Sequence, residues 1–322
     1  MVAMLDLLLL FVPFFALVLM GWAATRVRLV PIDGIGTMNS FVLFFGLSAM
    51  VFRLSASGAL MQNGLLGLLL AYGLAGTAVT GLALMWGVRS GLIRRDSGLV
   101  ALATAFPNTG FLGLPLLMGL LGPEAAGPIA ATLIVDVLLL SSLCLAWAHP
   151  GHVSIKGALR NPLLWAMGLG MGLWWSGWHL PHAVDETVRL LSLSATPTAL
   201  FTLGAILARS QMQSSMQAQV STPQGAAAAP SVWTPVLLKL VVHPWLVCGA
   251  GWVLVQSGVE LPPAGLLAMI LAAALPSASN VSMLAEREGA NTALVARIIL
   301  WTTASALLTV TLWAHAMGVQ PR

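Results

Sequence analysis

Long apolar stretches, interrupted only by short polar breaks, dominate this sequence and restrict the chain to folds that lie in a lipid bilayer. Hydrophobic residues make up 58% of its 322 residues, and charged residues only 7%. A soluble domain would need a much denser charged surface. With about 20 apolar residues per span, the chain can cross a bilayer roughly ten times. We therefore predict an all-α polytopic protein of the cell (inner or plasma) membrane, with the lipid bilayer as its partner.

Charged residues, glycine and proline divide the apolar stretches into ten candidate spans. The first half of the chain, residues 1–150, contains spans at 5–24, 34–52, 64–88, 97–121 and 126–148. The second half, residues 151–322, contains spans at 162–178, 188–208, 233–256, 264–285 and 291–317. The polar segment 209–231, rich in Gln, Ser and Ala, is expected to be a flexible loop.

Lysine and arginine are concentrated in alternate loops, and this bias predicts the orientation of the chain. Cytoplasmic loops retain these residues, whereas translocated loops lose them. With the N-terminus outside, the cytoplasmic loops hold Arg26, Arg28, Arg89, Arg94, Arg95, Lys156, Arg160, Arg209 and Arg287. The opposite side holds only Arg53, Arg189 and Arg322. Both termini are therefore expected to be extracytoplasmic. Because each half has five spans, the second half would be inverted relative to the first.

Proline interrupts the fourth and the ninth span near their middle, each time among small and polar residues. The fourth span reads Ala105-Phe106-Pro107-Asn108-Thr109-Gly110-Phe111, and the ninth reads Ala274-Leu275-Pro276-Ser277-Ala278-Ser279-Asn280. Proline removes a backbone donor and disrupts the preceding turn, so nearby backbone groups lose their helical partners. One such proline usually gives a simple kink. Two of them at corresponding places in inverted halves predict crossed, broken helices that share a binding site.

The residue types at these two breaks suit a small organic anion. The freed N-termini of half-helices attract negative charge, and amide and hydroxyl groups can donate hydrogen bonds to it. The predicted substrate-binding residues are Pro107, Asn108, Thr109, Pro276, Ser277, Ser279 and Asn280.

Several motifs resemble those of the auxin efflux carrier family, whose bacterial members include permeases for malonate and other organic acids. The most specific is Phe106-Pro107-Asn108-Thr109-Gly110-Phe111-Leu112-Gly113-Leu114-Pro115, together with Leu275-Pro276. Weaker matches are Asn39-Ser40-Phe41-Val42, Ala195-Thr196-Pro197, Lys239 with His243-Pro244, and Thr302-Thr303-Ala304-Ser305. The resemblance covers nearly the whole chain.

The resemblance implies the bile-acid-symporter-like fold, with ten helices, a scaffold (panel) domain and a transport domain that contains the crossover. It also implies a carboxylate substrate, with Asn108 as the substrate-contacting asparagine. The chain departs from the family pattern at Ser48, where a proline is usual, so Pro197 in the seventh span has no symmetric mate.

The candidate ion or charge-site residues inside the predicted spans are Asp136, Lys239, His243 and Arg297. A charged side chain costs about 2.5–3.5 kcal/mol at the helix centre on insertion scales unless it is paired or hydrated. Lys239 and Arg297 could attract a carboxylate, although both are close enough to a span end to snorkel to the interface. Asp136 is too short to snorkel, so it is the stronger candidate for a counter-ion or a coupling-cation site. His243 is either a proton relay or a structural hydrogen-bonding group.

Other classes of function have weaker support in the sequence. The scattered basic residues give no nucleic-acid-binding footprint. The chain contains neither an H-E-x-x-H nor a G-x-S-x-G motif, so we expect no enzyme, no metal and no cofactor beyond a coupling Na⁺ or H⁺. Inverted repeats favour alternating access over a passive channel. The alternatives left open are a sodium-coupled symporter of the bile-acid type, a channel or an intramembrane enzyme. A homodimer, the substrate and the direction of transport also stay open.

Overall fold

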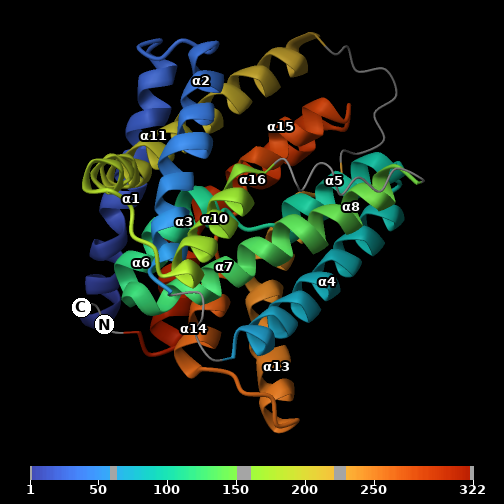
Figure 1. Ribbon diagram of the computed structural model, residues 1–322. Helices are drawn as coiled ribbons and strands as arrows, with labels where there is room; N and C mark the ends of the chain where they lie inside the picture. The colour runs from blue at the N-terminus through green and yellow to red at the C-terminus, as the bar shows by residue number, and fades with distance from the viewer. Residues whose placement is uncertain (1, 59–63, 151–160, 221–229, 320–322) are drawn as a thin grey trace.

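The described part of the chain consists of α-helices joined by turns, as expected for a polytopic membrane protein (Figure 1). The computed structural model describes residues 2–58, 64–150, 161–220 and 230–319. Within these ranges, seven helical stretches are long and apolar enough to cross a membrane. One of these stretches, Thr109–Ala148, is 40 residues long and passes through two of the predicted spans. The chain is therefore a multi-pass membrane protein.

The helices follow one another in an order that matches the predicted spans closely. In the first half they are α1 (Val2–Arg26), α2 (Gly34–Phe41), η1 (Val42–Gly46), α3 (Leu47–Ala56), α4 (Leu65–Arg89), α5 (Arg94–Ala105), η2 (Thr109–Gly113), α6 (Leu114–Leu121), η3 (Gly122–Ala125), α7 (Ala126–Ile134), η4 (Val135–Leu140) and α8 (Ser141–Ala148). In the second half they are α10 (Pro162–Ser176), α11 (His182–Val220), α12 (Trp233–Leu237), η5 (Leu238–Val242), α13 (His243–Gln256), α14 (Pro263–Ala273), α15 (Asn280–Arg287) and α16 (Thr292–Ala316). Elements η1, η2, η4 and η5 are π-helical turns, and η3 is a 3₁₀ turn.

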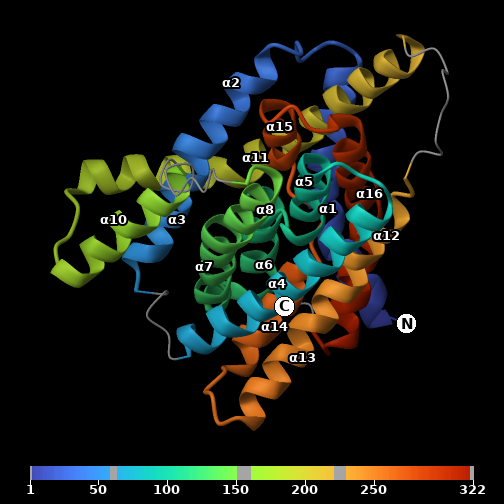
Figure 2. The same cartoon turned by 90° about the vertical axis from the view of Figure 1, so that its right-hand side faces the viewer.

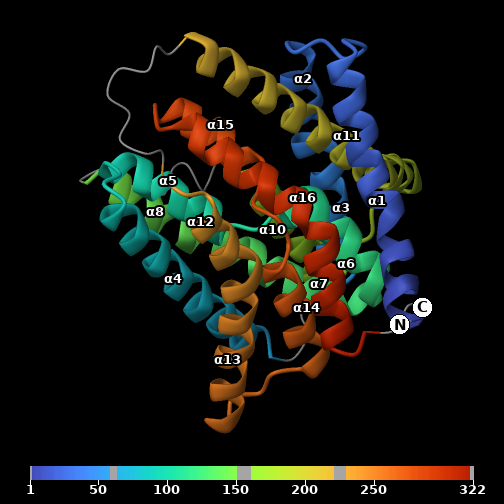
Figure 3. The same ribbon diagram turned by 180° about the vertical axis from the view of Figure 1, so that it is seen from behind.

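The helices form two packed groups. In one group α1 packs on α11, and α3 packs on both α10 and α11. In the other, α4 packs on α5 and α13, α8 packs on α5, and α14 packs on α13 (Figure 2). Helix α16 contacts α1 and α11 as well as α5, so it lies between the groups. Helix α1 begins and α16 ends toward the same end of the molecule (Figure 3).

Close approach of backbones holds α1 against α11. A Cβ atom on Gly21 would lie 1.9 Å from the carbonyl oxygen of Phe201, and one on Gly204 would lie 1.9 Å from that of Val18. Glycine is therefore required at both positions, because any side chain would push the helices apart. Small residues give the closest packing of helices in lipid, where the hydrophobic effect does not drive association.

A π-helical turn replaces the missing proline in the second predicted span. Turn η1 ends at Gly46, two residues before Ser48, whose hydroxyl donates to the carbonyl of Leu43 at 2.6 Å. The hydroxyl thus adds a hydrogen bond to a carbonyl of the π-helical turn. The span stays helical from Gly34 to Ala56 without a proline.

The predicted loop at residues 209–231 is wrong in its first half. Helix α11 continues through Arg209 to Val220 and is 39 residues long. The sequence there contains several Gln and Met residues, which are good helix formers, and their propensity outweighs the effect of the serines. Residues 221–229 lie outside the described ranges.

Candidate functional site

The two predicted helix breaks lie directly against each other. Helix α5 ends at Ala105 and helix α14 at Ala273, each shortly before its proline. The backbone N–H of Asn108 donates to the carbonyl of Pro276 at 2.8 Å, and the N–H of Ala278 donates to that of Phe106 at 3.0 Å. These bonds form an isolated antiparallel bridge between Pro107 and Ser277. Each break therefore supplies hydrogen-bond partners that the other lost with its helix.

Two side chains from neighbouring helices satisfy further backbone groups at the second break. The N–H of Ser277 would continue α14 by donating to the carbonyl of Ala273, but it donates instead to the hydroxyl of Thr302 on α16 at 3.1 Å. The freed carbonyl of Ala273 accepts a hydrogen bond from the ammonium of Lys239 at 2.9 Å. A cation at the C-terminal end of a helix is also favoured by the helix dipole. The end of α14 is thus fixed in place.

Four polar side-chain atoms at the breaks are buried without a hydrogen-bond partner among the described residues. They are Nδ2 of Asn108 and the hydroxyl oxygens of Thr109, Ser277 and Ser279. All four residues are at most 1% exposed. A buried polar group without a partner costs about 1–3 kcal/mol, so a cluster of four calls for a specific explanation. An occupant that accepts hydrogen bonds provides one.

The remaining predicted residues of this set lie close to the cluster. Pro107 and Pro276 are buried; Pro107 is a member of the bridge, and the carbonyl of Pro276 accepts one of its hydrogen bonds. Asn280 is the first residue of α15 and is exposed, so its side chain does not share the buried position of Asn108. The two halves of the site are therefore asymmetric: the first break contributes an amide and a hydroxyl, and the second contributes two hydroxyls.

Asp136, Lys239 and His243, although far apart in sequence, form one buried cluster. All three side chains have 0% exposure. The ammonium of Lys239 lies 3.3 Å from Nδ1 of His243, and Asp136 and Lys239 interact electrostatically. Asp136 lies in the π-helical turn η4, and Lys239 lies in η5. Since Lys239 also binds the end of α14, this cluster is linked directly to the second helix break.

Tyr72 completes the cluster, although it was not among the candidate residues predicted from the sequence. Its hydroxyl donates to Oδ1 of Asp136 at 3.0 Å, and its ring centroid lies 5.5 Å from that of His243. The other oxygen of Asp136, Oδ2, has no partner among the described residues. Tyr72 is the only tyrosine in the chain, and a phenol in the middle of an apolar helix was an available signal.

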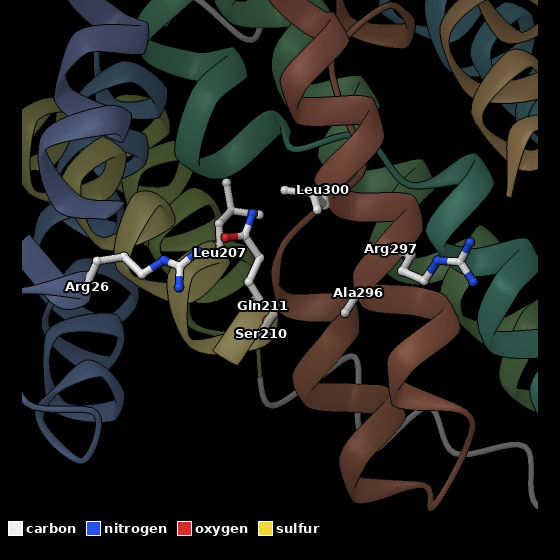
Figure 4. A pocket seen from close by; sticks show the side chains of 7 residues that line it. All are labelled: Arg26, Leu207, Ser210, Gln211, Ala296, Arg297 and Leu300. Atoms are coloured by element: carbon white, nitrogen blue, oxygen red, sulfur yellow. The ribbon is translucent and has the colours of Figure 1, made fainter. Parts of the chain in front are cut away.

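Arg297 lies apart from this cluster. Its side chain is exposed, and the residue lines a cavity of about 260 Å³ with Arg26, Leu207, Ser210, Gln211, Ala296 and Leu300. Arg26 points toward Gln211 across this cavity, whereas Arg297 extends to the other side of α16 (Figure 4). Arg26 stacks over the ring of Trp22 at 5.0 Å, and the indole N–H of Trp22 donates to Gln211 at 2.9 Å. The cavity lies between α1, α11 and α16.

The arrangement can bind a small anion at the breaks and holds the buried cluster of Asp136, Lys239 and His243 beside it. Donors at the breaks come from neutral groups, and the nearby ammonium of Lys239 is already bound to Ala273. Such a site stabilises a carboxylate without an ion pair that would have to break at each release. It has no nucleophile paired with a base at the breaks, within the described ranges.

Comparison with known proteins gives a family and two relatives. The family described as "Membrane transport protein" matches residues 7–154 and 151–314. An "Uncharacterized transporter" of Methanothermobacter thermautotrophicus is 26% identical over 310 residues, covering 92% of this chain and 94% of the relative. A "Putative malonate transporter" of Rhizobium meliloti is 24% identical over 313 residues, covering 93% of this chain and 92% of the relative.

Proposed function

The chain belongs to the membrane transport protein family, that is, the auxin efflux carrier family which its motifs resemble, and from this we propose that it is a secondary transporter of a small organic carboxylate. The single observation that carries the proposal is the cluster of four buried, unpartnered polar atoms at two bridged helix breaks. Membrane proteins keep such groups at depth where they line a binding site.

In this proposal the carboxylate binds between the breaks. The amide of Asn108 and the hydroxyls of Thr109, Ser277 and Ser279 donate hydrogen bonds to it. The N-terminal ends of η2 and α15 add positive potential. The name of the Rhizobium relative supports a dicarboxylate of malonate size as the first compound to test.

We further propose that the fold is an inverted repeat of ten spans, with residues 1–150 and 151–322 as its halves. Helix pairs α5–α6 and α14–α15 would be the crossed fourth and ninth spans. The group containing α1, α3, α10 and α11 would be the scaffold, and the group containing α4, α5, α13 and α14 would move against it. Both termini would be extracytoplasmic, as the distribution of Lys and Arg favours.

The cluster of Asp136, Lys239, His243 and Tyr72 is the proposed charge site. Its link to the end of α14 supports this role, because a change in its charge state would alter the break directly. Either H⁺ or Na⁺ could couple through the free oxygen of Asp136. Flux measured across a pH gradient and, separately, a sodium gradient decides between these ions and uniport.

A ligand-dependent thermal shift tests the substrate site. Purified protein is melted with malonate, succinate, acetate and a neutral diamide of malonate, because a ligand stabilises the state it binds. We expect carboxylates to raise the melting temperature of the wild type and to leave that of Asn108→Ala unchanged. The matched control is Ser282→Ala, whose hydroxyl is already bonded to the Ser279 carbonyl at 2.7 Å.

Counterflow in proteoliposomes tests the mode of transport. A carrier loaded with unlabelled carboxylate accumulates labelled carboxylate transiently, whereas a channel does not. In the thermal-shift experiment, a rise in melting temperature with neutral or cationic compounds alone would overturn the carboxylate assignment and leave the family membership intact.

A further inference from the structure

A second pair of buried polar groups lies away from the breaks, on helices α2 and α11. Asn39 is 5% exposed and Thr202 is 0% exposed. Oδ1 of Asn39 and the hydroxyl of Thr202 have no hydrogen-bond partner among the described residues. Most other threonines in the helices donate to a carbonyl of their own helix, as Thr198 does to Ser194 at 2.5 Å. Thr202 is thus unusual for a threonine in α11.

The packing of α2 on α11 places these two residues at the same level. The helices run antiparallel: Ile35 packs with Ala205 and Ile206, and Gly46 lies against Ala195. Asn39 is four residues after Ile35, and Thr202 is four residues before Ile206. One helical turn therefore separates each of them from the same contact, on facing helices.

Asn39 also contacts the half-helix that starts at the second break. The amide Nδ2 of Asn39 lies 3.7 Å from the sulfur of Met283, which is three residues after Asn280 on α15. Sulfur is a weak acceptor, so this contact leaves most of the hydrogen-bonding capacity of the amide free.

We propose that Asn39 and Thr202 form a second polar binding station, which the carboxylate occupies on its way to or from the helix breaks. The proposal rests on the carboxylate transport proposed above. The hydroxyl of Thr202 can donate to a carboxylate oxygen, and the unpartnered Oδ1 of Asn39 can accept from a water molecule bound to that carboxylate. Neutral groups suit a transit position because they bind the anion less strongly than a buried cation would.

Thiol labelling tests this station directly. Thr202→Cys is made in a protein that also carries Cys144→Ala and Cys248→Ala, the only cysteines of the chain. The protein is reconstituted and treated with a small charged methanethiosulfonate reagent, with and without saturating malonate. We expect Thr202→Cys to react and malonate to slow the reaction at least fivefold. Thr198→Cys, one turn away on α11, is the matched control and should show no effect of malonate.

A flux measurement with an isosteric variant separates binding from packing. We expect Thr202→Val to melt at or above the wild-type temperature, since it removes a buried group without a partner. Its flux at saturating malonate should fall about fivefold, the effect of losing one neutral hydrogen bond in the rate-determining passage. Asn39→Leu should show the same loss of flux. In the double variant, flux should fall by a smaller factor than the product of the two single-variant factors.

The outcomes distinguish this proposal from the previous one. If malonate shifts the melting temperature of the wild type but does not protect Thr202→Cys, the second station is overturned and the site at the breaks stands. If Thr202→Cys does not react at all, the station is likewise overturned. If no carboxylate shifts the wild type, both proposals fail.

Discussion

The α1–α11 contact and the paired helix breaks are both buried, yet they are built in opposite ways. Between α1 and α11, Gly21 and Gly204 bring backbones so close that a single Cβ would lie 1.9 Å from a carbonyl oxygen. At the breaks, four polar side-chain atoms are buried without partners, and the backbone depends on bonds from one break to the other. The first region has no room for a ligand, and the second has hydrogen-bonding capacity to spare.

This difference indicates which region is rigid and which one binds. The contact between α1 and α11 brings backbone against backbone without a gap, so opening it would lose close packing and expose no binding group. The breaks retain groups that only an additional partner can satisfy, and this makes the ligand-free site intrinsically less stable than its surroundings. Substitutions in the two regions should therefore affect stability and binding in different ratios.

The largest expected effect concerns Lys239, which connects the breaks to the charge cluster. Lys239→Met removes the buried ammonium that donates to Ala273 and interacts electrostatically with Asp136. Breaking a buried pair in this way destabilises a protein by about 3–5 kcal/mol. We expect a large fall in the melting temperature of the detergent-solubilised protein. The double variant Lys239→Met/Asp136→Asn should recover a good part of the lost melting temperature. If the single variant Lys239→Met is as stable as the double variant, the electrostatic interaction between Lys239 and Asp136 is contradicted.

A smaller loss of stability is expected at the α1–α11 contact. Gly204→Ala places a Cβ 1.9 Å from the Val18 carbonyl oxygen, and overpacking costs typically about 1–3 kcal/mol. The matched control is Gly168→Ala on α10, where nothing lies within 4 Å of the added Cβ. The control should gain up to about 1 kcal/mol from helix propensity. Equal melting temperatures for the two variants would mean that α1 and α11 can move apart without a loss of stability.

The smallest effect on stability is expected at the breaks, together with a clear effect on binding. Ser279→Ala removes a buried hydroxyl without a partner, so the melting temperature of the ligand-free protein should stay constant or rise. Carboxylate affinity, measured by titration calorimetry, should fall by roughly 2- to 13-fold, equivalent to one neutral hydrogen bond of about 0.5–1.5 kcal/mol. A destabilised variant with normal affinity would show that Ser279 serves the fold and not the ligand.

The sequence predicted the breaks well because their cause is local. Pro107 and Pro276 stop their helices through a missing donor and a steric clash that act within one turn. Apolar length and composition likewise predicted the membrane class. The end of α11 was predicted less well, since the choice between loop and helix after Arg209 depends on small differences in propensity.

Other features depended on contacts between segments far apart in the chain. Tyr72, Asp136 and Lys239 come from three different spans, and no spacing in the sequence brings them together. Arg297 and Lys239 looked alike in the sequence, but one is exposed and the other is fully buried. The pairing of Asn39 with Thr202 follows only from the antiparallel packing of α2 on α11.

The sequence by itself determined that this protein lies in a membrane, belongs to a transporter family and interrupts two of its helices. Those properties follow from hydropathy, proline chemistry and local motifs, which act over one span or less. Only the tertiary structure decided that the two interruptions bond to each other, that Lys239 holds the end of α14, and which polar groups stay without a partner. Hydrogen bonding is satisfied over the whole fold, so a group without a partner is recognised only when all of its neighbours are in place.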